Sequence, residues 1–295
     1  MTDPETAGGR RAGEPDPSRV REGLGVALGA GGARGFAHVV LLEALDELGV
    51  VPVAITGSSM GAIVGAAYAA GYSGRDLRAH LLRVLGRRHH VMGLLLDARV
   101  GKFTDVLRRG FSNPVMIDAE VMLGAFWPSG MPDSFEALSI PFAAIATDYH
   151  ARVELLLDHG PLRSAVAGSM AIPGLVRPVL RNGRTLVDGA AVNPLPYDRL
   201  PARAVKVVAC DVVAGPVSDI GAIPTPFEAM FGSAQIMQSA ITAKMLRNRA
   251  PDLLLRPAVQ AFKALDFFRF SKILRAAEDE KDEIKRAIER VLDPP

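Results

Sequence analysis

The sequence predicts an α/β fold with parallel strands, and two stretches of the chain carry this prediction. Residues 24–55 follow the order strand, glycine-rich turn, helix and strand, with apolar residues at near-helical spacing over 36–48. Such a unit implies parallel pairing of its strands through a right-handed crossover. Residues 53–65 (VAITGSSMGAIVG) then pass from a β-branched strand through glycine and serine into a small, apolar helix.

Composition narrows the classes of function. The chain has 295 residues, of which 49% are hydrophobic, so it can bury a substantial core. It carries 34 basic and 32 acidic residues and no long basic run, so we expect no nucleic-acid partner. Cys210 is its only cysteine, which excludes an internal disulfide and fits a reducing, cytoplasmic setting. The apolar runs fall short of the roughly 20 residues that span a bilayer, and we find no targeting segment.

The chain divides into a tail and one domain. Residues 1–22 are rich in Pro, Gly and charged residues, which predicts a disordered tail. The domain covers 23–295, with a core at 24–210 and a helical part at 215–295. Within the core, the Met- and aromatic-rich segment 72–135 is either ordinary core, the commoner case, or a cover over an acyl-chain pocket. Further strands are expected at 141–146, 153–157, 185–187, 205–210 and 253–255, and further helices at 75–85, 161–171, 227–247 and 276–292.

The sequence Gly57-Ser58-Ser59-Met60-Gly61 lies between the strand and the helix of the second stretch. In that context a G-x-S-x-G motif places its serine on a sharp turn, where the hydroxyl projects from the sheet. Gly57 and Gly61 are needed where a β-carbon would collide with the neighbouring chain. Ser59 would also lie at the start of a helix, whose free N–H groups favour a developing negative charge. Ser59 is therefore the candidate nucleophile.

The turn GAGGARG, from Gly29 to Gly35, admits two interpretations. It is no dinucleotide fingerprint, because the spacing requires a third glycine where Arg34 stands, and no Gly-Lys-Ser/Thr follows for a phosphate loop. One interpretation is a backbone anion site, in which the amides of Gly31 and Gly32 point at a developing oxyanion. The other is that the glycines only permit a tight turn. The residues alone leave both open.

A serine nucleophile needs a base, and the sequence offers two arrangements. The usual order of Ser, acid and then His would have to end at His150 or His159, because no histidine follows. A Ser–Asp dyad needs no histidine, and Asp188, at the end of a strand, is its natural candidate, although an Asp-Gly pair alone is more often a simple turn. The adjacent pair at 89–90, two histidines, does not suit a metal site, because neighbouring side chains diverge.

Taken together, four blocks of sequence resemble the patatin-like phospholipase family. The last of these blocks departs from the family pattern, because Ala190 follows Gly189 where most members carry a second glycine. Ala30 is a smaller departure of the same kind. The four blocks, in chain order, are GAGGARG at 29–35, GSSMG at 57–61, SMAIP at 169–173 with Pro178 beyond it, and DGA at 188–190 followed by NPLP at 193–196.

The resemblance implies a three-layer α/β/α fold with a mostly parallel central sheet, and a lipid acyl hydrolase. Ser59 would attack the ester, Asp188 would accept its proton, and the amides of Gly31 and Gly32 would hold the oxyanion with Arg34 nearby. No cofactor or metal is implied, and membrane contact would be peripheral; the oligomeric state is left open. A short-chain carboxylesterase and a non-catalytic protein that binds lipid or a partner are the two alternatives.

Overall fold

The computed structural model describes residues 23–86, 99–100, 116–216 and 223–293. The tail predicted at 1–22, the histidine pair at 89–90 and much of the proposed cover at 72–135 lie outside these residues. Among the described helices, none is both long and apolar enough to cross a membrane.

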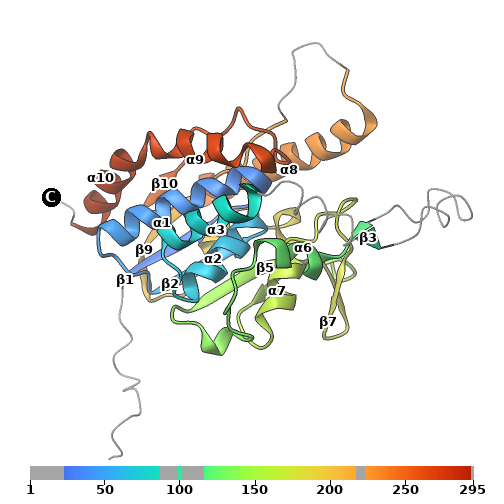
Figure 1. Ribbon diagram of the computed structural model, residues 1–295, viewed down its shortest axis with the longest axis horizontal. Coiled ribbons are helices and arrows are strands. Elements are labelled where there is room, and N and C mark those ends of the chain that lie inside the picture. The colour runs from blue at the N-terminus through green and yellow to red at the C-terminus, as the bar shows by residue number, and fades with distance from the viewer. Residues whose placement is uncertain (1–22, 87–98, 101–115, 217–222, 294–295) are drawn as a thin grey trace, which may run out of the picture.

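Within the described residues, eight strands form one central sheet (Figure 1). Five of them are parallel neighbours, and β6, β7 and β8 join antiparallel at the β5 side. Each strand is hydrogen-bonded to the next in the series β10 (Leu253–Leu255), β9 (Ala204–Cys210), β1 (Gly23–Leu28), β2 (Ala54–Ser58), β5 (Phe142–Asp148), β8 (Arg184–Asp188) and β7 (Val179–Arg181). Strand β6 (Val153–Leu157) also pairs with β5. A separate antiparallel pair joins β3 (Arg99–Val100) and β4 (Met116–Ile117).

Most helices pack on one face of the sheet, and 3₁₀ turns with the end of α8 cover the other, so the fold is the expected three-layer α/β/α arrangement. The α1, α9 and α10 helices lie together along one side in Figure 1. The helices are α1 (His38–Glu47), α2 (Met60–Ala69), α3 (Gly74–Gly86), α6 (Ala119–Phe126), α7 (Leu162–Ser169), α8 (Pro226–Asn248), α9 (Phe270–Glu278) and α10 (Lys281–Leu292), with 3₁₀ turns η1 (Gly32–Ala37), η3 (Phe135–Ala137), η4 (Gly189–Ala191), η5 (Tyr197–Arg199) and η6 (Phe267–Arg269).

The two outer layers differ in thickness. Leu24, Val26 and Leu28 alternate along β1 toward the large core that the helices α1, α2, α9 and α10 complete. Ala27 faces the other way, into a small cluster with Tyr197 and the end of α8. The second layer is thin because it consists mainly of 3₁₀ turns and that one helix end.

Three sequence predictions need correction. The helix expected at 276–292 is two helices that meet at Asp279 and Glu280. Both contact α1, but α9 also packs on η1, whereas α10 also packs on β9 and β10. The strand at 205–210, whose apolar run predicts a buried strand, is buried only over its last three residues, where the sheet is covered on both faces. The helix expected from residue 36 begins as the 3₁₀ turn η1.

The described parts of segment 72–135 are core rather than cover. Leu77, Leu81 and Leu85 of α3 are buried, as are Met122 and Phe126 of α6. These side chains belong to the same large core as α1 and α2. The commoner interpretation therefore holds for α3 and α6, and the remainder of the segment lies outside the described residues.

Candidate active site

The sheet register brings the ends of β2 and β8 together. Both strands pair with the same edge of β5, because β6 occupies its opposite edge at residues 144–148. Strand β2 runs parallel to β5 and ends with Ser58 opposite Ile145. Strand β8 runs antiparallel and ends with Asp188 opposite Ala146, the next residue of β5. The two carboxyl ends therefore meet head to head.

Ser59 follows β2 on a strained turn, as the motif predicts. Its backbone has φ 54° and ψ −118°, a conformation that is costly for any residue with a β-carbon. A β-carbon at Gly57 would overlap the backbone of Gly61, and one at Gly61 would overlap the carbonyl of Leu28. Both motif glycines are therefore required by close backbone packing, and α2 starts immediately after Ser59.

Ser59 and Asp188 form a direct hydrogen bond. Ser59 Oγ donates to Asp188 Oδ2 at 2.7 Å, and Ala190 N donates to Asp188 Oδ1 at 2.8 Å. Burial raises the pKa of Asp188 from 3.8 to about 6, against the two hydrogen bonds that lower it. Gly189 has no room for a β-carbon, which would overlap the carbonyl of Ile145. The methyl group of Ala190, the departure from the family pattern, is buried without disturbing the Ala190 N–H bond.

Two further polar side chains hold this pair in place, and sequence reasoning gave neither of them a role. Ser169 Oγ, at the end of α7, accepts the N–H of Ser59 at 3.0 Å and is fully buried. Thr147 Oγ1 donates to the carbonyl of Asp188 at 2.9 Å. The only sequence signal for Ser169 was its place in the SMAIP block, and a lone small polar residue at the end of a helix gives none.

The glycine-rich turn lies against the start of α2, because a β-carbon at Gly35 would overlap Met60. The N–H groups of Gly29, Ala30 and Ala33 donate to the carbonyls of Cys210, Pro194 and Ala264. The amides of Gly31 and Gly32 donate to no acceptor in the described part of the chain. The turn thus carries two N–H groups without a partner among the described residues.

Both of these glycines are required by their surroundings. A β-carbon at Gly31 would lie 2.8 Å from the carbonyl oxygen of Val212. Gly32 has φ 58°, and its β-carbon would overlap the carbonyl of Ala264. The two segments after β9 and before η6 therefore fix the path of the turn.

Arg34 is buried and braces this turn. Its Nε donates to the carbonyl of Gly31 at 3.3 Å. Burial lowers the pKa of Arg34 to about 10, and the charge of Asp211 partly offsets this effect. Asp211 itself accepts from Arg256 at 3.0 Å. Arg34, which the resemblance places near the oxyanion, thus contacts the turn as an anchor of its backbone.

None of the histidines in the described residues bonds to Ser59. His150 and His159 are exposed, and among the described residues neither bonds to Ser59. His38 is fully buried, and its Nε2 lies 2.8 Å from the carbonyl oxygen of Gly29, which fixes Nε2–H as the donor. Burial lowers the pKa of His38 to about 4, so this ring is neutral at physiological pH. His38 therefore supports the glycine turn and is not placed as a base.

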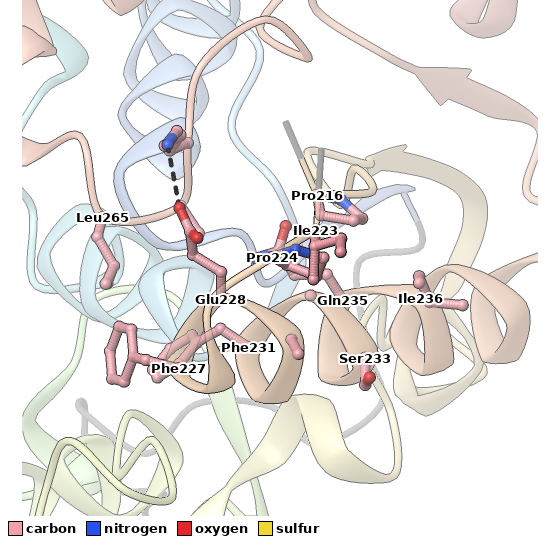
Figure 2. A pocket seen from close by; sticks show the side chains of 14 residues that line it. Pro216, Ile223, Pro224, Phe227, Glu228, Phe231, Ser233, Gln235, Ile236 and Leu265 are labelled. Carbon is pink, nitrogen blue, oxygen red and sulfur yellow. Dashed lines mark ion pairs between the residues drawn. The ribbon is translucent and has the colours of Figure 1, made fainter. Parts of the chain in front are cut away.

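A cavity of about 730 Å³ opens between α8 and the segment at 263–265 (Figure 2). Phe227, Phe231, Ile236 and Leu265 make its walls largely apolar, and Glu228 reaches toward Lys263 at 3.8 Å. Neither Ser59 nor Asp188 lines this cavity. It meets the site through Ala264, which lines the cavity and accepts the N–H of Ala33.

No group of three or more His, Cys, Asp or Glu side chains suited to a metal ion occurs within the described ranges. Cys210 is buried in the sheet, and burial raises the pKa of its thiol, so the thiolate is disfavoured. The chemistry available at the site is thus that of a hydroxyl, a carboxylate and backbone amides.

Comparison with known proteins agrees with the four sequence blocks. A family model described as patatin-like phospholipase matches residues 26–201. An uncharacterized NTE family protein of Mycobacterium tuberculosis is 40% identical over 173 residues, which are 59% of this chain and 44% of that protein. Lysophospholipase NTE1 of Candida glabrata is 25% identical over 283 residues, which are 88% of this chain and 16% of that protein.

The chain therefore spans less than half the length of these relatives. Among solved structures, VipD from Legionella pneumophila aligns with 90% of this chain and 67% of its own, at a TM-score of 0.46 and 14% identity.

Proposed function

The chain belongs to the patatin-like phospholipase family, and from this premise we propose that it is a serine acyl hydrolase that cleaves carboxylic esters of lipids. Phospholipids and lysophospholipids are the proposed substrates. The observation that carries the proposal is the 2.7 Å hydrogen bond from Ser59 Oγ to Asp188 Oδ2. That bond joins a serine on a strained turn to a buried carboxylate, which is how a hydroxyl is activated without a histidine.

In the first half of the reaction, Ser59 Oγ attacks the ester carbonyl carbon as its proton passes to Asp188. The tetrahedral intermediate carries its negative charge on the former carbonyl oxygen, which the amides of Gly31 and Gly32 would hold. Collapse of the intermediate expels the alcohol, which takes the proton from Asp188, and leaves an acyl group on Ser59. Water then attacks this acyl-enzyme with Asp188 again as base, releasing the fatty acid.

The surroundings of Asp188 suit it to this work. A pKa of about 6 leaves the side chain ionised at neutral pH and makes it a stronger base than an exposed aspartate. The bond from Ala190 N occupies Oδ1, so Oδ2 is the atom that faces the serine proton. Ser169 and Arg34 act as positioning residues, through Ser59 N–H and the carbonyl of Gly31.

A short-chain carboxylesterase would use the same residues and differ only in the depth of its acyl site. The apolar cavity of about 730 Å³, which meets the glycine turn through Ala264, favours longer chains because it offers apolar volume beside that turn. A protein that only binds lipid would not need the strained serine turn, whose cost is of order 1–3 kcal/mol.

Initial rates on nitrophenyl esters of increasing acyl length, with one phospholipid, test the proposal. We expect rates that rise with chain length and vanish in Ser59→Ala, while Ser271→Ala, a change on the exposed surface of α9, stays active. Full activity of a folded Ser59→Ala protein would overturn the mechanism. Activity confined to short esters would instead favour the carboxylesterase.

A further inference from the structure

Helix α8 exposes apolar side chains that the described fold leaves uncovered. It is 23 residues long, yet only Gly232 and Thr242 are buried. Phe227, Met230 and Met237 are 48%, 50% and 59% exposed. By contrast, α9 and α10 turn their large apolar residues, such as Ile273 and Ile288, into the core. An unburied apolar surface of this kind marks an interaction site.

Exposed residues, together with the partly buried Ile241, form one stripe along the helix. Met230, Met237 and Lys244 follow one another at intervals of seven residues, so they lie on the same face. Phe227 and Ile241 flank Met230 and Met237 at intervals of three and four. We call these five residues the α8 stripe. Met230, Met237, Ile241 and Lys244 do not line the cavity, so most of the stripe lies on a different face of the helix.

The charge on this face has one sign. Lys244 is exposed and makes no ion pair with any described residue. The single acidic residue of α8, Glu228, bonds to Thr225 in the helix cap and pairs with Lys263 at the cavity. An apolar face that ends in a lysine matches the boundary of a lipid layer, with alkyl chains below and anionic headgroups above.

The stripe is also continuous with the candidate site. The cavity lies on the neighbouring face of α8, formed by residues such as Phe231 and Ile236. Met230 itself packs beside Gly174, just beyond the SMAIP block that supplies Ser169. The helix further contacts η4, the turn that follows Asp188. One helix therefore joins the exposed surface to the cavity and to the catalytic edge of the sheet.

We propose that the α8 stripe is the surface by which this protein docks on a lipid layer that carries anionic headgroups. The inference rests on the proposed function, since a lipid hydrolase must take its substrate from such a layer. Docking through the stripe would place the apolar cavity at the layer, so that an acyl chain could pass into it without crossing water.

Vesicle binding tests the proposal directly. The double variant Met230→Gln with Met237→Gln is compared with Val51→Gln with Val205→Gln, which removes apolar surface that is 71% and 51% exposed at the amino edge of the sheet. Each pair is placed in a Ser59→Ala background, which prevents hydrolysis of the vesicles. Flotation is measured with vesicles of phosphatidylcholine alone and with one quarter phosphatidylglycerol.

We expect the stripe variant to weaken binding to both kinds of vesicle by about tenfold or more, and the control pair to leave it unchanged. Lys244→Gln should reduce the preference for phosphatidylglycerol about fivefold. With Ser59 restored, hydrolysis of nitrophenyl butyrate, a soluble ester, should stay within about twofold in every variant.

Unchanged vesicle binding by the stripe variant would overturn the inference while leaving the proposed function intact. The same holds if the variant instead abolishes self-association, measured by light scattering, because the stripe would then be an interface between two copies of the chain. Failure of the proposed function has a separate signature, namely ester hydrolysis that survives Ser59→Ala.

Discussion

The carboxyl ends of the central strands, here called the sheet edge, contact the helix α8, but the two regions differ in how far their side chains are buried. At the sheet edge, Ser59, Asp188 and Ser169 are buried and bonded to one another or to backbone. Along α8, the apolar side chains are half exposed and only two residues are buried. The fold therefore holds the proposed reacting groups in buried hydrogen bonds, whereas α8 keeps an exposed apolar surface that would contact a partner. Most of the predictions below set a change at the edge beside a change on the helix.

The largest expected effect is the loss of the base. Asp188→Asn keeps an acceptor for Ala190 N–H but cannot take the serine proton, so kcat should fall by about 10³- to 10⁴-fold. The polar change Gln238→Ala on α8 should leave kcat within about twofold. Steady-state rates on a soluble ester measure both, and an Asp188→Asn enzyme with more than a tenth of the wild-type kcat would contradict the dyad.

The same substitution should stabilise the protein. Because burial raises the pKa of Asp188 to about 6, its ionised form destabilises the fold at neutral pH. Asp188→Asn removes this cost, which is about 2–3 kcal/mol of unfolding free energy at pH 7. The gain should shrink as the pH falls from 6 to 4, where the wild-type side chain becomes protonated. Denaturant unfolding at pH 7 and pH 4 checks the sign, and a destabilised variant at pH 7 would refute it.

Alanine substitutions of two glycines, Gly61 and Gly232, test the difference in packing between the sheet edge and α8. Gly61→Ala drives a methyl group into the carbonyl of Leu28, so we expect a loss of about 3 kcal/mol in unfolding free energy and a large fall in activity. In Gly232→Ala on α8, the new methyl group would lie 3.2 Å from Cβ of Pro216, so its close contacts are with that one side chain. The gain in helix propensity should offset that contact to within about 1 kcal/mol. Thermal unfolding of the two variants measures both changes in stability. Equal losses in Gly61→Ala and Gly232→Ala would mean that the chain around Gly61 is not tightly packed.

The pH dependence of the rate should report Asp188. The reaction needs the carboxylate, so kcat/KM should fall about tenfold per pH unit below a midpoint near 6. Val51→Gln, far from the edge, should leave that midpoint unchanged. A midpoint near 4 would mean that Asp188 is not desolvated in the working enzyme.

The smallest effect concerns the support of the nucleophile. Ser169→Ala removes the acceptor of Ser59 N–H, so kcat should fall about tenfold with little change in KM. Asn248→Ala, at the exposed end of α8, should change neither. Rescue by Ser169→Thr, which restores a hydroxyl, would separate positioning from general packing, and an unaltered kcat in Ser169→Ala would remove Ser169 from the account.

The sequence predicted those features that depend on residues adjacent in the chain. The turn at Ser59 followed from a strand, two glycines and a helix that are contiguous, and the structure confirms that geometry. Asp188 was harder, because it meets Ser59 through the antiparallel β8, 129 residues away, and only the resemblance favoured it over a simple turn. The anchoring by Ser169 is a tertiary contact, and its only sequence signal was the place of Ser169 in the SMAIP block.

Periodicity likewise could not predict whether the apolar residues of α8 are buried or exposed. Its apolar positions are compatible with either core or interface, since spacing shows that residues share a face and not what covers that face. The C-terminal correction has the same origin. Residues 276–292 keep a helical pattern across Asp279, and the break between α9 and α10 is seen only in their tertiary contacts, with η1 for α9 and with β9 and β10 for α10.

The central claim is that Ser59 is the activated nucleophile and Asp188 its base. Labelling with a long-chain fluorophosphonate, followed by intact-mass and peptide analysis, tests it most directly. The account predicts one adduct per chain, carried on Ser59, absent in Ser59→Ala and formed at least 100-fold more slowly in Asp188→Asn. An adduct on another residue, or equal labelling of Ser59→Ala, would contradict it.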